Sequence, residues 1–237
     1  MKTTILFILI FISGINNATE IVLNSEDTQT QVIELYTSEG CSSCPPADRW
    51  LSSLKSHTRL FKDFIPVAFH VGYWDYLGWK DELALPQNSN RQRRHKQDNN
   101  LNSVYTPGVL KAGNEWRRWR GVKINRDTNK VGALKLVIKN NKLKAQFNAL
   151  EPVQYKLVVA LLGMNIDTKV LAGENRGETL THDFVLLKKQ IFQANNAQWT
   201  GSISDDFFQS KHKNTALVAW IEKINNPAPI QAVGTFL

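Results

Sequence analysis

Cysteine and methionine are scarce in this sequence, with two of each among 237 residues. A structural zinc site usually needs four ligands, and no second cysteine pair is present to complete one. No methionine-rich or histidine-rich tract accompanies the cysteines, as a carrier of soft metal ions would favour. No apolar run is long enough to cross a bilayer, and no internal repeat or low-complexity tract is found. The chemistry of the chain is therefore sought around its two cysteines.

Residues 1–18 are predicted to be a secretory signal peptide. Lys2 supplies the positive charge, residues 5–12 supply a short apolar core, and Ala18 offers a cleavage point. No cysteine lies near the cut to carry a lipid anchor. We therefore expect a periplasmic or secreted protein without stable membrane insertion after cleavage of the signal. In such an oxidising compartment, a lone cysteine pair is either a disulfide or a catalytic pair.

Both cysteines stand at the junction of a predicted strand and a predicted helix. Residues 32–37 are β-prone and the run ends at Gly40, after which Cys41-Ser42-Ser43-Cys44 follows. The helix is indicated by apolar residues at helical spacing, which are Ala47, Trp50, Leu51 and Leu54. Pro45 and Pro46 fall in its first turn, where the N–H groups that proline lacks would have no partner within the helix. Cys41 is thus expected just ahead of a helix N-terminus, where free N–H groups and the helix dipole favour a thiolate.

Three other interpretations of the cysteine pair compete with redox chemistry. A buried apolar pair is one, although a Gly-Cys-Ser-Ser-Cys-Pro-Pro turn is a poor place to bury anything. A purely structural disulfide is another, although so short a loop constrains the unfolded chain little. Half of a metal site is the third. We favour a redox dithiol, with metal binding next.

An apolar run at residues 64–71 predicts a buried strand, joined to the first strand by the helix as a parallel β-α-β unit. An aromatic-rich segment, residues 72–81, follows this strand. It begins at the carboxyl end of the strand, which is the edge of the sheet where α/β proteins place their sites. It is interpreted either as a lid over the site or as an aromatic plug on the core. In the first case it contributes the substrate-binding residues Tyr73, Trp74 and Asp75.

The stretch from Asn88 to Lys130 is strongly basic. It holds eleven Lys or Arg and three Asp or Glu, so its net charge is 11 − 3 = +8. This equals the formal net charge of the whole chain. An acidic partner, a membrane surface and nucleic acid are the candidate partners for such a stretch. Export argues against nucleic acid, and we favour a solvated helix face followed by an exposed hairpin. That hairpin is predicted to pair residues 104–110 with residues 116–119.

From about residue 131 the sequence consists of short β runs separated by turn residues. One clear hairpin turns at Asn140-Asn141. With no convincing long amphipathic helix, this part predicts an antiparallel sandwich. We therefore expect two domains after the signal peptide, over residues 30–125 and 131–237.

Five stretches of the chain resemble the exported family catalogued as domain of unknown function 1223. They are Glu34 to Asp48 around the cysteines, Phe69 to Asp81, Arg91-Gln92, Val104-Tyr105-Thr106-Pro107, and Gly173-Glu174-Asn175 with Thr179 to Asp183. The resemblance implies an α/β thioredoxin-like domain followed by a mostly antiparallel β-sandwich-like domain. The chain departs from the family pattern at residues 108–113 and in its basic hairpin, which puts the substrate preference in question.

By this resemblance Cys41 is the attacking cysteine and Cys44 the resolving one. Pro107 corresponds to a proline with a cis peptide bond beside the dithiol, which presents the Thr106 backbone to an extended substrate. Glu34, near the end of the first strand, is a candidate proton carrier for Cys44, or else an ordinary strand residue.

His70, at the end of the second strand, either tunes the thiolate and contacts substrate or is a core-edge histidine. Together these residues predict an exported thiol–disulfide oxidoreductase. Its expected partner is a disulfide-containing protein or a small thiol, and no cofactor or metal is expected.

Two functions of other classes remain open. One is a carrier of Cu(I) that uses Cys41, Cys44 and His70, since two thiolates suit this ion. The other is a non-catalytic interaction module whose β-rich part docks a partner. For that module, residues 173–175 and 181–183 mark either a docking surface or a turn with an inter-domain hydrogen-bond network, and we favour the turn.

Overall fold

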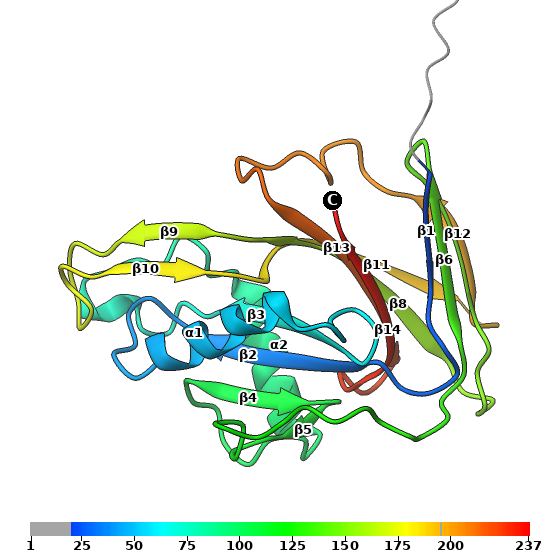
Figure 1. The fold of residues 1–237 in the computed structure, drawn as a ribbon, viewed down its shortest axis with the longest axis horizontal. Coiled ribbons are helices and arrows are strands. Elements are labelled where there is room, and N and C mark those ends of the chain that lie inside the picture. The colour runs from blue at the N-terminus through cyan, green and yellow to red at the C-terminus, as the bar shows by residue number, and fades with distance from the viewer. Residues whose placement is uncertain (1–19, 195) are drawn as a thin grey trace, which may run out of the picture.

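The strand that leads into the cysteine motif lies inside a mixed eight-stranded sheet. In this computed structural model, which describes residues 20–194 and 196–237, β2 (Gln31–Thr37) and β3 (Phe64–His70) are buried along their whole length. They pair with each other in parallel and are connected by a segment that contains α1 (Pro45–Ser53). On its other side β2 pairs with antiparallel β4 (Gly108–Lys111). The predicted β-α-β unit is therefore confirmed (Figure 1).

The full sheet runs in the order β14-β13-β8-β11-β3-β2-β4-β5. Its further members are β5 (Asn114–Glu115), β8 (Tyr155–Gly163), β11 (Val185–Ala194), β13 (Thr215–Lys223) and β14 (Pro229–Phe236). β8, β13 and β14 are antiparallel neighbours, and β11 continues this antiparallel set beside β8. At its first residue, Val185, β11 also pairs in parallel with Ala68 of β3. One sheet therefore holds strands from both predicted domains.

The predicted fold class is wrong. The expectation was an α/β thioredoxin-like domain followed by a separate antiparallel β-sandwich-like domain. Among the described residues, strands predominate over several sheets, and the only α-helices are α1 and α2 (Pro86–Gln97). The physical reason is the contact between β11 and β3, which extends the first sheet into the C-terminal strands. No pattern within either strand could have predicted that pairing.

A second sheet covers part of the large one. It has the order β1-β6-β7-β12, formed by β1 (Ile21–Asn24), β6 (Leu134–Lys139), β7 (Lys142–Phe147) and β12 (Gln198–Ser202). Alternate residues of β6 and β7 are buried, and they pack with alternate residues of β8 and β13 in one apolar cluster. Asn140 and Asn141 both have positive φ, as the predicted hairpin turn requires. Figure 1 shows this sheet at the far end of the molecule from α1.

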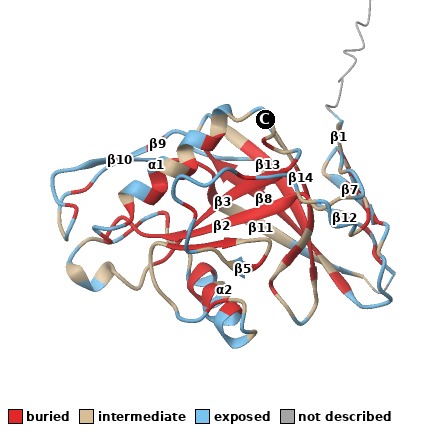
Figure 2. Ribbon diagram, turned by 60° about the horizontal axis from the view of Figure 1, so that its bottom comes forward, coloured by how far each residue is buried: buried red, intermediate tan, exposed pale blue. Residues whose placement is uncertain are grey.

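Helix α2 lies against the large sheet and is very polar, yet it buries four polar side chains, Asn88, Ser89, Gln92 and His95. Figure 2 shows its buried side turned toward the sheet. The hairpin after it differs from the prediction, because β5 covers only Asn114–Glu115 and residues 116–119 are not a strand. Those residues instead pack on α1, where Trp50 contacts the rings of Trp116 and Trp119.

A two-stranded arm completes the fold. It consists of β9 (Ile166–Lys169) and β10 (Thr179–His182), which pair antiparallel and lie beside α1 (Figure 1). The connection between them, residues 170–178, reaches the cysteine motif. No helix among residues 20–194 and 196–237 is long and apolar enough to cross a membrane. The predicted signal peptide, residues 1–18, lies outside the described residues.

Candidate functional site

Cys41 and Cys44 form a disulfide at the start of α1, with their Cα atoms 5.4 Å apart. Cys44 occupies the N-cap position of the helix, and its N–H donates to the carbonyl of Cys41 over 3.1 Å. Both cysteines are buried, whereas Ser42 and Ser43 between them are exposed. The expectation that this turn is a poor place for burial is therefore wrong.

The connection between β9 and β10 explains the burial, since it lies over the disulfide turn. Asn175 Nδ2 donates to the carbonyls of Glu39 and Cys41 over 2.8 and 3.1 Å. The Glu174 carboxylate accepts from the Ser42 N–H at 3.0 Å, and this bond lowers the Glu174 pKa. The sequence analysis favoured a turn for residues 173–175. Their place in a family motif was the one signal that they belong to the site, and it did not indicate contact with the cysteines, which are more than a hundred residues away in the chain.

On the other side of the turn lie Trp74 and the Thr106–Pro107 peptide, which is cis. Trp74 Nε1 donates to Thr106 Oγ1 at 2.7 Å. A Cβ atom placed on Gly40 would lie 2.9 Å from Trp74 Cβ, so glycine is required for this close approach. The structure thus connects Pro107, Thr106 and Trp74 to the turn that holds Cys41.

Tyr73 and Asp75 face a neighbouring pocket of about 600 Å³. The Tyr73 hydroxyl donates to Gln92 Oε1 at 3.2 Å, and Gln92 Nε2 donates to the carbonyl of Tyr105 at 2.7 Å. Burial raises the pKa of Tyr73 to about 12, so its hydroxyl stays protonated. The aromatic segment is therefore fixed through α2 to the residues just before Pro107.

His70 is fully buried in a group we call the acid–histidine cluster: Glu39, Asp48, His70, Asp81, His182. His70 Nδ1 lies 2.8 Å from Asp81 Oδ2, and its ring is 4.6 Å from that of His182. His182 Nε2 is 3.4 Å from Glu39 Oε1. A buried histidine enclosed in this way has no free edge for substrate, so His70 belongs to the support of the site.

The acid–histidine cluster approaches the disulfide from two directions. Glu39 is two residues before Cys41, and Asp48 is one helical turn after Cys44, with its N–H donating to the Cys44 carbonyl at 3.1 Å. Thr37 Oγ1 donates to Asp48 Oδ2 at 3.1 Å. A pocket of about 120 Å³ lies between α1 and β10 and is lined in part by Asp48 and His182. This pocket gives solvent a route toward the buried acid.

Burial and neighbouring charges shift the pKa values of two members of the acid–histidine cluster, Asp48 and His70. Burial raises the pKa of Asp48 above its usual range, because the charged form loses its hydration. Burial would lower the pKa of His70, but the Asp81 carboxylate raises it above its ordinary value. Asp48 is thus a carboxyl group that gains and loses a proton closer to neutral pH than an exposed aspartate. Its position four residues after Cys44 was visible in the sequence, and sequence reasoning passed over it.

Glu34 lies in a different group of charges, around Arg91. Its Oε2 accepts from Arg91 Nε at 2.8 Å and from the Tyr36 hydroxyl at 2.9 Å, and it lies 3.2 Å from His95 Nε2. Burial would raise the Glu34 pKa, but the charges of Arg91 and His95 hold it far below its ordinary value. A carboxylate that stays ionised is unsuited to proton transfer, and no contact joins Glu34 to either cysteine.

Within the described part of the chain, no group of three or more His, Cys, Asp or Glu side chains is arranged to hold a metal ion. His70 in particular lies with its Nδ1 2.8 Å from Asp81 Oδ2.

Three comparisons with known proteins bear on this chain. The family model described as "Protein of unknown function (DUF1223)" matches residues 32–222. No curated protein matches. A crystal structure of protein AGR_C_4864 from Agrobacterium tumefaciens is similar, with a TM-score of 0.61 and 19% identity over 90% of this chain and 96% of that one. HBP35 of Porphyromonas gingivalis is similar with a TM-score of 0.57 and 13% identity, over 89% of this chain and 76% of that one. At these identities the likeness shows a shared fold alone.

Proposed function

The chain belongs to the DUF1223 family of proteins of unknown function. We propose from its site that it is a thiol–disulfide oxidoreductase, and from the signal peptide predicted at residues 1–18 that it is periplasmic or secreted. One observation carries the proposal. The chain's only two cysteines form a disulfide at the N-terminus of α1, and a buried aspartate with a raised pKa lies one helical turn behind the second cysteine. Helix N-termini favour thiolates, and resolution of a mixed disulfide needs a proton acceptor.

The reaction begins from the reduced dithiol. The Cys41 thiolate attacks one sulfur of a substrate disulfide, a Cys41–substrate bond forms, and the substrate's other sulfur leaves as a thiolate. Cys44 then loses its proton and attacks the Cys41 sulfur, which releases the second substrate thiol and restores the Cys41–Cys44 disulfide. Two electrons and two protons pass to the substrate. A dithiol or monothiol reductant must then reduce the protein for another cycle.

Asp48 is the residue we assign to the proton of Cys44. It follows Cys44 by one turn on the same helix face, and it lines the small pocket between α1 and β10. Its raised pKa brings it nearer to that of a thiol, which makes proton transfer less uphill than it would be for an exposed aspartate. Thr37, whose hydroxyl donates to Asp48 Oδ2 at 3.1 Å, is a positioning residue for this acid.

Reduction of a protein disulfide in the presence of a metal chelator and a thiol reductant tests the proposal. Wild-type protein should accelerate the reduction, Cys41→Ser should abolish the acceleration, and Cys44→Ser should accumulate the mixed disulfide. Cu(I) titration of the same reduced variants is the counter-test. Tight binding of one copper ion without disulfide turnover would replace the oxidoreductase by a copper carrier, and inactivity in both assays would favour an interaction module.

A further inference from the structure

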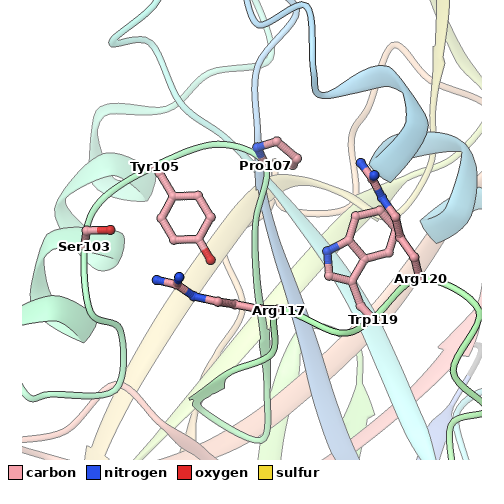
Figure 3. Close-up of a pocket in the computed structure, with 6 residues that line it drawn as sticks. All are labelled: Ser103, Tyr105, Pro107, Arg117, Trp119 and Arg120. Carbon is pink, nitrogen blue, oxygen red and sulfur yellow. The ribbon is translucent and has the colours of Figure 1, made fainter.

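The pocket of about 410 Å³ beside Pro107 is lined by Ser103, Tyr105, Pro107, Arg117, Trp119 and Arg120, which we call the arginine pocket (Figure 3). Its size is within the range of roughly 300–1,000 Å³ that ligand pockets occupy. Pro107 connects it to the cysteine turn through Thr106 and Trp74. The pocket therefore shares Pro107 with the loop that lies beside the cysteine turn.

The arginine pocket has an excess of positive charge. Residues 111–123 contain five Lys or Arg and one acid, Glu115. Arg117 Nε donates to that carboxylate at 2.9 Å, and the Tyr105 hydroxyl donates to it at 2.8 Å. Among the described residues Arg120 has no carboxylate partner, so its guanidinium remains available. Arg117 also keeps donors free, since a guanidinium carries five N–H groups.

Both guanidinium groups are held in place by aromatic rings. Arg120 lies over the Trp119 ring at 4.9 Å, and Arg117 lies over Tyr105 at 5.7 Å. Trp119 is in turn buried against Trp50 of α1, with ring centres 4.8 Å apart. Such stacking restricts the arginine side chains before any ligand arrives, so binding costs less conformational entropy. Figure 3 shows both side chains on one loop, with Arg117 turned toward Tyr105 and Arg120 beside Trp119.

We propose that the arginine pocket binds carboxylate groups of an extended peptide next to the reacting disulfide, so that the substrates are acidic peptides or proteins. This inference rests on the proposed function, because the disulfide defines which ligands reach the pocket. Planar guanidinium groups match carboxylates in geometry and charge. Attraction to the surplus positive charge would also speed the encounter with acidic substrates at low salt.

The test uses two synthetic peptides, each closed by one disulfide. In the acidic peptide the disulfide is flanked by Asp and Glu, and in the neutral peptide the same positions hold Asn and Gln. We expect wild-type kcat/KM to be about 3- to 10-fold higher for the acidic peptide at low salt, in line with partly exposed charge pairs. The double variant Arg117→Gln/Arg120→Gln should bring this ratio close to one. Arg118→Gln is the matched control, because Arg118 is exposed but does not line the pocket.

A cysteine-free acidic peptide, followed by fluorescence anisotropy, separates this inference from the proposed function. If it binds wild type several-fold more tightly than the double variant while no disulfide is turned over, the oxidoreductase proposal fails and the pocket assignment stands. If disulfides are turned over without preference for acidic peptides, or if the preference persists in the double variant, the pocket assignment is overturned. Tighter binding of single-stranded DNA than of acidic peptide through the same arginines would overturn it as well.

Discussion

Two buried groups of charged side chains, one around Arg91 and the other the acid–histidine cluster, differ in how fully their charges are paired. Around Arg91, the carboxylates of Glu34 and Glu222 lie 2.8 and 2.6 Å from its guanidinium, and Lys156 lies 3.0 Å from Glu222. Two acids therefore face two bases, and His95 also lies 3.2 Å from Glu34. In the acid–histidine cluster, three acids, Glu39, Asp48 and Asp81, face two histidines, His70 and His182.

Buried atoms without a hydrogen bond are more numerous in the acid–histidine cluster. They are His70 Nε2, both ring nitrogens of His182 and Glu39 Oε1, whereas the Arg91 group has one such atom, Glu34 Oε1. Buried polar atoms of this kind cost stability and concentrate at functional sites. The charges of the Arg91 group stabilise one another, whereas the acid–histidine cluster holds a carboxyl group, that of Asp48, whose pKa burial raises. Four predictions test this contrast.

The largest effect is expected from Arg91→Leu. Its removal leaves Glu34 and Glu222 buried without their shared partner, and it also deprives the Pro227 carbonyl of a 2.7 Å donor. We expect the free energy of unfolding to fall by about 3–5 kcal/mol, as for a broken buried ion pair. Urea unfolding measures it. Arg93→Gln, an exposed position on the same helix, is the control and should change stability by less than about 1 kcal/mol.

Acid should remove part of the same stabilisation. The pKa of Glu34 lies below its ordinary value of 4.5 in the folded protein, so the unfolded chain takes up the proton first as pH falls. Stability from ionised Glu34 is therefore fully present above about pH 4.5 and declines below it. Unfolding free energies measured from neutral to acidic pH should fall for wild type below this point. An equally steep fall in Glu34→Gln would assign the loss to other carboxylates.

For Asp48→Asn we expect slower chemistry without loss of stability. Without the acid, deprotonation of Cys44 loses its acceptor, so turnover should fall about 100-fold at neutral pH and recover as pH rises. Because the Asp48 pKa is raised, folding disfavours its charge, and the neutral variant should be at least as stable as wild type. Quenching the reaction at successive times and measuring the mixed disulfide over a range of pH gives the first effect. Asp98→Asn, at the C-cap of α2, is the control. An unchanged pH profile would remove Asp48 from the reaction.

The smallest effect is expected from Glu174→Gln. The carboxylate bonded to the Ser42 N–H places negative charge beside the dithiol turn, which opposes a thiolate at Cys41. The Cys41 thiol pKa, already expected below the ordinary value of about 8.5, should fall further, with alkylation about 2-fold faster near neutral pH. Alkylation rates against pH in a Cys44→Ser background measure this. A slower Cys41 in the Gln variant would contradict the electrostatic explanation.

What the sequence could predict was local. The strand, turn and helix around the cysteines depend on neighbouring residues, and they are present as β2, the disulfide turn and α1. The hairpin at Asn140-Asn141 follows from two residues that tolerate positive φ. The family signature was also recognised from contiguous motifs.

What the sequence could not predict depends on contacts between distant segments. The pairing of β11 with β3 changes the fold class, and no periodicity within either strand indicates its neighbour. The segment of Trp116 and Trp119 has strand-like composition but packs on Trp50 instead. The burial of the disulfide comes from Asn175, across 134 residues of chain. Long-range packing outweighed local propensity in each case.

The reduction potential of the Cys41–Cys44 pair tests the central claim most directly. Equilibration with defined ratios of reduced and oxidised glutathione or dithiothreitol, followed by alkylation and mass analysis, gives this value for the purified protein. A redox-active dithiol should have a potential between about −270 and −120 mV, the range of thioredoxin-type and oxidising dithiols. A potential below about −300 mV would identify a structural disulfide and contradict the account.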